Sequence, residues 1–173
     1  MRGMGGPGAL LPGRTPFGAP RAAATGARVA RLKETGAVGY GDEATIRRIL
    51  TEAGDTWAVV GLSNNRDRAA YGVAQVLQRF GKRIVPVHPK AETVHGEQGY
   101  ASLADIPFDV DVVDVFVNSA LAGAVADEAV AKGAKAVWFQ LGVVDEDACA
   151  RTRAAGLDMV MDRCPAIEIP RLR

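Results

Sequence analysis

A glycine-led polar loop is the part of this sequence best suited to binding an anion. It reads Gly61-Leu62-Ser63-Asn64-Asn65-Arg66 and starts inside the apolar run Thr56–Leu62. Glycine lets a ligand approach the backbone, serine and asparagine supply hydrogen bonds, and a helix starting just after the loop would point free N–H groups at an anion. We therefore predict a phosphate site at Gly61, Ser63, Asn64, Asn65 and Arg66.

The loop lacks the two common nucleotide-binding patterns. A G-x-G-x-x-G dinucleotide fingerprint would need glycine where Ser63 and Arg66 stand, and no Gly-Lys-Ser/Thr of a Walker loop follows. A plain polar surface connection is the alternative interpretation of the segment.

A lysine after the next apolar run narrows the choice of ligand. An NAD site usually has an acidic residue at this place, whereas this chain reads His88-Pro89-Lys90. A cation there suits a phosphorylated ribose, which belongs to CoA through its 3′-phosphate or to NADP through its 2′-phosphate. The residues leave both ligands open, and Lys90 could also be a solvated surface residue.

Two later loops are expected to border the same crevice. Asn118 and Ser119 follow one apolar run, and either could bond a ligand, while Ser119 could instead cap the helix that follows. Gln140, Leu141 and Gly142 follow another run. Gly142 could admit a pantetheine arm close to the backbone, and Gln140 could meet its amides.

The elements that position these loops alternate between strand and helix patterns. Apolar runs predict strands over 56–62, 83–87, 112–117, 136–140 and 157–161, and helical periodicity separates most of them. Asp42, Ser119 and Asp145 are predicted helix caps, Phe80 is predicted to face inward, and Pro86 indicates a strand near an edge. This is an α/β chain with a single Rossmann-like doubly wound parallel sheet of about five strands and flanking helices.

The first part of the chain differs in composition from the rest. Residues 1–38 are rich in Gly, Pro, Ala and Arg without apolar periodicity, which predicts a disordered tail before a domain over 42–173. A natural extension, an organellar targeting segment and a start site placed too early all remain open for the tail.

Charge and hydropathy limit the partners. Six of the 21 basic residues lie within residues 1–33, which hold no acid, so the remainder carries 15 basic against 20 acidic residues. This balance argues against nucleic acid as a partner, and no run is long and apolar enough for a membrane span. We expect a cytoplasmic protein.

The sequence gives little support for metal binding or for catalysis by cysteine or histidine. Cys149 and Cys164 have no metal-binding spacing, and His88 and His95 are the two histidines, so we predict no metal site and no catalytic residue. Cys164 stands beside Arg163, which leaves open a mixed disulfide with the thiol of CoA.

Five segments in order resemble the small stand-alone CoA-binding proteins: AVVGLS (58–63), YGV (71–73), VPVHPK (85–90), VWFQLGV (137–143) and MDRCP (161–165). That family is similar to the N-terminal domain of the succinyl-CoA ligase alpha subunit. The resemblance covers residues 42–173 and implies a Rossmann-type CoA site. It places the loop at Gly61, Ser63 and Asn64 on the phosphates, Lys90 near the nucleotide end, and residues 140–142 along the ligand. Tyr71, from the second segment, joins the predicted binding residues.

The resemblance decides between the two ligands that the residues leave open. It implies a protein that binds CoA or an acyl-CoA without chemistry of its own, as a carrier, a sensor or a partner of an acyl-CoA enzyme, with a homo-oligomer also open. His88 departs from the family, which commonly has Asn there, and the second domain that carries the ligase's phosphorylated histidine is missing. The alternatives are an NADP-dependent oxidoreductase and a redox protein that acts through Cys164.

Overall fold

The sheet has five parallel strands, as the sequence predicts. The computed structural model describes residues 40–172, so the predicted tail over 1–38 lies outside the described residues. The strand order is β2-β1-β3-β4-β5. The strands are β1 (Thr56–Val60), β2 (Arg83–Val87), β3 (Val112–Val115), β4 (Ala136–Phe139) and β5 (Asp158–Val160).

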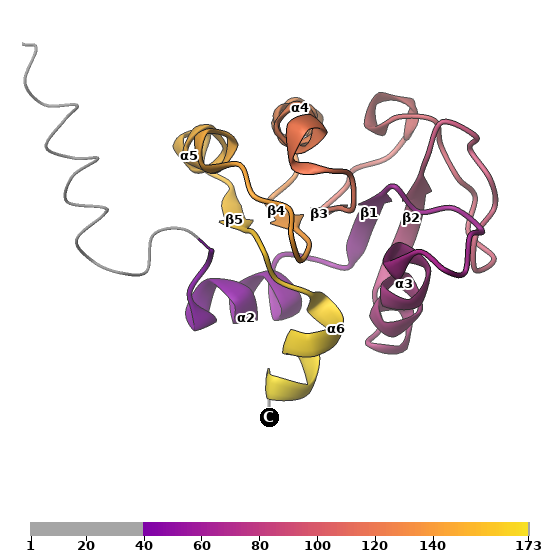
Figure 1. Cartoon of the computed structure of the whole chain (residues 1–173), viewed down its shortest axis with the longest axis horizontal. Helices are drawn as coiled ribbons and strands as arrows, with labels where there is room; N and C mark the ends of the chain where they lie inside the picture. The colour runs from indigo at the N-terminus through magenta and orange to yellow at the C-terminus, as the bar shows by residue number, and fades with distance from the viewer. Residues whose placement is uncertain (1–39, 173) are drawn as a thin grey trace, which may run out of the picture. The chain divides into compact units, whose positions relative to one another are not determined.

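Helices cover both faces of the sheet (Figure 1). They are α2 (Glu43–Thr51), α3 (Ala69–Arg79), α4 (Ser119–Lys132), α5 (Glu146–Ala154) and α6 (Pro165–Glu168), with 3-10 turns at Leu103–Asp105 and Ile169–Leu172. α4 and α5 lie on one face, while α2, α3 and α6 lie on the other (Figure 1). Within residues 40–172, no helix is both long and apolar enough to cross a bilayer.

Each face of the sheet has its own hydrophobic core. On the α2, α3 and α6 side, Trp57 and Trp138 are fully buried with ring centroids 6.2 Å apart. On the α4 and α5 side, the fully buried Phe139 packs with alanines of α4. Strands buried on both faces explain why the sequence shows continuous apolar runs rather than alternation. The resulting rigid sheet carries the loops at its carboxyl ends.

Two of the three predicted helix caps are confirmed, and one is wrong. Asp42 accepts from the Thr45 N–H at 2.7 Å and Asp145 from the Ala148 N–H at 2.9 Å. α4 is capped by Asn118, whose Oδ1 accepts from the Leu121 N–H at 3.2 Å. Ser119 already lies inside the helix, and its hydroxyl oxygen instead accepts from the Val144 N–H at 3.0 Å.

The prediction that β2 is an edge strand is confirmed, whereas the prediction that Phe80 faces inward is wrong. β2 ends the strand order, where the missing N–H of Pro86 costs no central ladder bond. Phe80 is 36% exposed, because α3 ends at Arg79 and Phe80 lies at its C-cap. The Lys82 Nζ lies 5.8 Å from the centroid of its ring.

Candidate functional site

The strand order creates a crevice at the carboxyl ends of β1 and β3. From β1 the chain crosses to β2 on one side, and β3 then returns to the other side of β1. Ligands of doubly wound sheets bind at such a switch point. A cleft of about 1050 Å³ lies there, lined from the loops after β1, β2, β3 and β4. Its size is at the upper end for small-molecule sites, which suits a long ligand.

The glycine at the start of the loop after β1 is required by both conformation and space. Gly61 has φ +99°, a left-handed conformation that favours glycine. A Cβ at this position would lie 3.2 Å from the Cβ of Phe116. The loop can therefore turn sharply above the sheet and pass close to the loop after β3.

Polar side chains shape the rest of this loop. Ser63 Oγ accepts from the Asn65 N–H at 3.3 Å, and Asn65 Oδ1 accepts from the Asp67 N–H at 3.0 Å. Asn64 Nδ2 donates to the Thr93 carbonyl oxygen at 3.0 Å. These bonds fix the loop that leads into α3, whose N-cap residue Arg68 makes no side-chain capping bond. The N-terminus of a helix favours an anion.

Glu92 is a cleft residue that sequence reasoning missed. Its Oε2 accepts from the Asn64 N–H at 3.2 Å, so a carboxylate lies against the predicted phosphate loop. No local pattern marks Glu92, because it lies 28 residues from Asn64 and meets it through the fold.

Two basic side chains line the cleft without a carboxylate partner within residues 40–172. Lys90, which was predicted, and Arg68, which was not, both line it and are exposed. His88 Nδ1 accepts from the Lys90 N–H at 3.2 Å, so this histidine shapes the turn that carries Lys90. Arg68 is the last residue before α3, and that position was the signal that could have found it.

The loop after β4 is held by two remote side chains. The Gly142 N–H donates to Asp162 Oδ1 at 2.8 Å, and the Ser119 hydroxyl lies 3.4 Å from the Gly142 carbonyl oxygen. Asp162 has φ +53°, an uncommon conformation for a residue with a side chain. Sequence reasoning quoted the MDRCP segment but missed this positioning role of its aspartate.

Gln140 points into the protein rather than into the cleft. It is 5% exposed, and its Nε2 donates to Asp114 Oδ1 at 2.6 Å. Burial raises the pKa of Asp114 from 3.8 to about 7, against the lowering effect of the bond from Gln140. The second oxygen, Asp114 Oδ2, is buried and has no hydrogen-bond partner among the described residues. Asp114 lies within β3 and Gln140 directly follows β4, so the two side chains meet inside the sheet rather than in the cleft.

Eight of the eleven predicted binding residues line one cleft: Gly61, Ser63, Asn64, Asn65, Lys90, Asn118, Leu141 and Gly142. Gln140, Arg66 and Tyr71 are not among its lining residues. The Arg66 guanidinium lies 5.8 Å from the centroid of the Tyr71 ring, which in turn packs against His95 with centroids 4.1 Å apart. Arg66, Tyr71 and His95 thus contact one another beside the loop and do not line the cleft.

Both cysteines are buried as free thiols. Cys164 is 8% exposed, and burial raises the pKa of its thiol, an effect that N–H groups of Ala166 and Ile167 oppose. Burial also raises the pKa of Cys149. Residues 40–172 hold no group of three or more His, Cys, Asp or Glu side chains placed to bind a metal.

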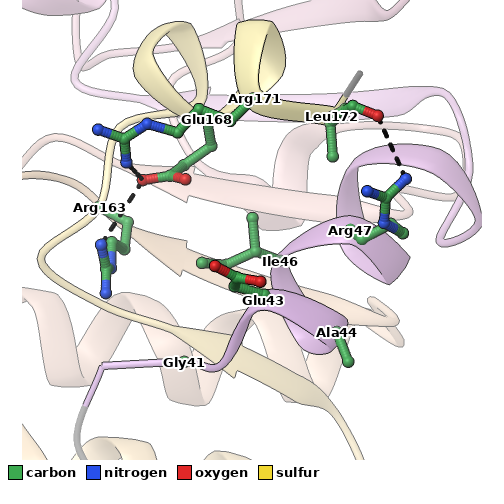
Figure 2. Close-up of a pocket in the computed structure, with 9 residues that line it drawn as sticks. All are labelled: Gly41, Glu43, Ala44, Ile46, Arg47, Arg163, Glu168, Arg171 and Leu172. Carbon is green, nitrogen blue, oxygen red and sulfur yellow. Dashed lines mark hydrogen bonds and ion pairs between the residues drawn. The ribbon is translucent and has the colours of Figure 1, made fainter.

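A smaller pocket of about 400 Å³ lies between α2 and the segment that follows β5 (Figure 2). Its charged side chains come from Arg47, Arg163, Arg171, Glu43 and Glu168. Glu168 Oε1 lies 3.2 Å from Arg171 Nη1 and 3.7 Å from Arg163 Nη1. Arg47 Nη1 donates to the Leu172 carbonyl oxygen at 3.3 Å. The three guanidinium groups are therefore already bonded within the protein.

Two known proteins are similar to this chain over most of their length. YneT of Bacillus subtilis, described as uncharacterized, is 34% identical over 122 residues, which is 70% of this chain and 90% of YneT. The solved structure of a hypothetical protein from Pyrococcus horikoshii OT3 is 38% identical with a TM-score of 0.71, covering 76% of this chain and 92% of that one.

A longer relative contains a similar segment. The ADP-forming acetate–CoA ligase of Methanocaldococcus jannaschii is 28% identical over 78 residues, which is 45% of this chain but 11% of the ligase. A family model described as a CoA binding domain matches residues 55–170. Since that match includes every strand of the sheet and every residue that lines the cleft, the chain belongs to the CoA-binding domain family.

Proposed function

We propose that this protein binds CoA or an acyl-CoA in the cleft and acts as a non-catalytic carrier, sensor or partner of an acyl-CoA enzyme. The observation that carries the proposal is the meeting, at one switch point, of the glycine-led loop with two unpaired cations, Lys90 and Arg68. A glycine loop alone would serve many anions. Together with two cations, it suits a ligand that carries several phosphates.

Each side of the cleft has its own part in this proposal. Gly61, Ser63 and Asn65 bind the diphosphate through the loop and the start of α3. Lys90 and Arg68 neutralise the phosphates, including the one on the ribose. On the other side, Asn118 and Gly142 border the pantetheine arm, whose amides need hydrogen-bonding partners.

The acetate–CoA ligase of M. jannaschii supports a role beside an enzyme, because the similar segment there makes up 11% of a larger chain. A separate chain with that segment would deliver or sense CoA for catalytic parts carried elsewhere. A partner enzyme, self-association and a cytoplasmic location stay predictions from the sequence.

Two alternatives differ in how well they fit the structure. NADP also carries a ribose phosphate, so the same cations would serve it, and affinity for each ligand must decide. A mixed disulfide between CoA and Cys164 needs an accessible thiolate, whereas burial raises the pKa of Cys164 and leaves it 8% exposed.

Calorimetric titration of the protein with CoA and with NADPH tests the proposal. We expect saturable binding of CoA, and at least tenfold weaker binding after Lys90→Glu, since the change replaces an attraction to phosphate by a repulsion. Arg79→Glu, a charge reversal at the far end of α3, is the matched control and should leave the CoA affinity unchanged.

The outcomes separate the alternatives. No heat at millimolar CoA would overturn the proposal. Tighter binding of NADPH than of CoA would favour the oxidoreductase, and thermal-shift measurements with both ligands give an independent check, because bound ligand raises the melting temperature. A mass increase on Cys164 after treatment with CoA disulfide would support the redox alternative.

A further inference from the structure

Two exposed leucines face the cleft from different elements. Leu121, in the first turn of α4, is 56% exposed, and Leu141, after β4, is 58% exposed. Single exposed apolar side chains are ordinary, but these two both line one cleft and give it apolar surface. Of the five large apolar residues exposed among residues 40–172, these are the two that line the cleft.

Leu141 is held in place by the residues on either side of it. The Val143 N–H donates to the Gln140 carbonyl oxygen at 2.9 Å, which closes a tight turn around Leu141. The side chain of Gln140 is bonded to buried Asp114, and the Gly142 N–H is bonded to Asp162. A leucine kept exposed on such a fixed turn can bind a ligand without the entropy cost of ordering the backbone.

Leu121 is equally well supported. Its N–H donates to the capping Oδ1 of Asn118, so it lies in a fixed first turn of α4. The two leucines thus come from two rigid supports that Ser119 joins, because its hydroxyl contacts both Gly142 and Val144.

The cleft has a basic residue after β2 and uncharged residues after β4. Lys90 follows β2 and Leu141 follows β4, which the strand order places three strand spacings apart, about 14 Å. Leu141, Gly142 and Val143, which line the cleft after β4, carry no charge. CoA has its phosphates at one end and its thiol at the other, so phosphates bound near Lys90 direct the thiol toward the leucines.

A carboxylate further along α4 limits what can follow the thiol. Glu128 lines the cleft seven residues after Leu121, which is about two helical turns on the same face. Its negative charge in the same cleft disfavours an acyl group that ends in a carboxylate, whereas an uncharged acyl chain is not repelled.

We propose that Leu121 and Leu141 form an acyl-group subsite, so that the protein prefers CoA thioesters of uncharged, apolar acyl groups to free CoA and to thioesters of dicarboxylic acids. The proposal rests on the CoA-binding function proposed above, and it names the class of acyl group that the site takes.

Calorimetry with free CoA, acetyl-CoA, butyryl-CoA, hexanoyl-CoA and succinyl-CoA tests the subsite. A fully buried methylene strengthens binding about fourfold, and a half-buried one about twofold. We therefore expect hexanoyl-CoA to bind about tenfold more tightly than acetyl-CoA, and butyryl-CoA at least about threefold more tightly than succinyl-CoA.

The double variant Leu121→Ser with Leu141→Ser should reduce the ratio of hexanoyl-CoA to acetyl-CoA affinity from about tenfold to about twofold, because the apolar surface is removed. Ile167→Ser is the matched control, since Ile167 is exposed on α6 outside the cleft, and it should keep the ratio. Melting temperatures verify that all variants are folded.

Three results would overturn the subsite. They are equal affinities along the acyl series in the unmodified protein, an unchanged ratio in the double variant, and tighter binding of succinyl-CoA than of butyryl-CoA. Equal affinities for every CoA species would point instead to a protein partner at the leucines. Failure to bind any CoA species would overturn the proposed function itself, so the two failures are distinguishable.

Discussion

Basic side chains gather at two places in this molecule, with opposite consequences. In the pocket between α2 and α6, Glu168 is 8% exposed and lies between Arg163 and Arg171 (Figure 2). In the cleft, Lys90 and Arg68 are exposed and have no acidic partner among the described residues. The first group of charges is neutralised by the fold, and the second is left to be neutralised by a ligand.

The difference teaches that charge alone does not mark a binding site. The pocket with more arginines ties the C-terminal segment to α2, whereas the cleft with fewer cations has the free ones. What distinguishes the two is whether a partner already satisfies each cation. Changes at single residues can therefore separate effects on stability from effects on binding.

We expect the largest effect on stability at Asp114, because a negative charge on this buried carboxyl would have neither a charged partner nor water around it. The pKa of Asp114 in the folded protein, about 7, lies above its usual value of 3.8. Binding of the proton therefore stabilises the folded state. This stabilisation is complete below about pH 4 and is lost as the pH rises through about 7. The shift corresponds to about 4 kcal/mol. Chemical denaturation at a series of pH values should show this fall in the free energy of unfolding, and Asp114→Asn should abolish it.

The control for Asp114 is built into the pH series. Below about pH 4, where the carboxyl is protonated in both states, Asp114→Asn and the unmodified protein should differ least. An equal pH dependence in both proteins would contradict the assignment.

Glu168→Gln tests the neutralised pocket and should have the next largest effect. Removing the charge leaves Arg163 and Arg171 without their shared partner, but both are exposed enough for water to screen them. We expect the free energy of unfolding to fall by about 1 to 2 kcal/mol, measured by chemical denaturation. The CoA affinity should not change, and a loss of affinity without a loss of stability would refute the structural role.

Arg68→Ala and Arg171→Ala are a matched pair across the comparison. Removing Arg68 should weaken CoA binding about fivefold with little change in stability, because one attraction to phosphate at an exposed site is worth about 1 kcal/mol. Arg171→Ala should lower stability by less than about 1 kcal/mol and leave binding unchanged. Calorimetry measures the CoA affinity of both variants, and thermal melting measures their stability. A weaker CoA affinity of Arg171→Ala would contradict the assignment of the two sites to different roles.

The smallest effect is expected at Glu92, whose carboxylate lies in the cleft against the Asn64 N–H. Glu92→Gln keeps an oxygen that can accept this bond but removes repulsion of the phosphates. CoA should bind about threefold more tightly, and the gain should shrink at high salt, where the repulsion is screened. Calorimetry at low and high ionic strength measures both. A weaker affinity would show that Glu92 supports the loop more than it repels the ligand.

Much of the fold was predictable because short sequence patterns determine where strands and helices begin and end. Continuous apolar runs located all five strands, and Asp42 and Asp145 marked the starts of α2 and α5. Pro86 indicated the edge strand. The loops follow from the strands, so eight of the eleven predicted binding residues line a single cleft.

The errors arise where two local patterns compete or an element ends. Asn118 and Ser119 are both good capping residues, and the structure gives the cap to Asn118 because Ser119 bonds the distant Val144 N–H. Phe80 matched the apolar face of α3 but falls just past its end, where the chain turns away.

By itself, the sequence determined the α/β alternation and the places of the loops that line the cleft, because periodicity and capping act within a few residues. Only the tertiary structure decided that Gln140 turns inward to Asp114, that Asp162 holds Gly142, and that Glu92 meets Asn64. These partners lie 20 to 28 residues apart in sequence. Their meeting depends on which strands are neighbours and on which way a side chain points at the end of a strand, and no local pattern carries that information.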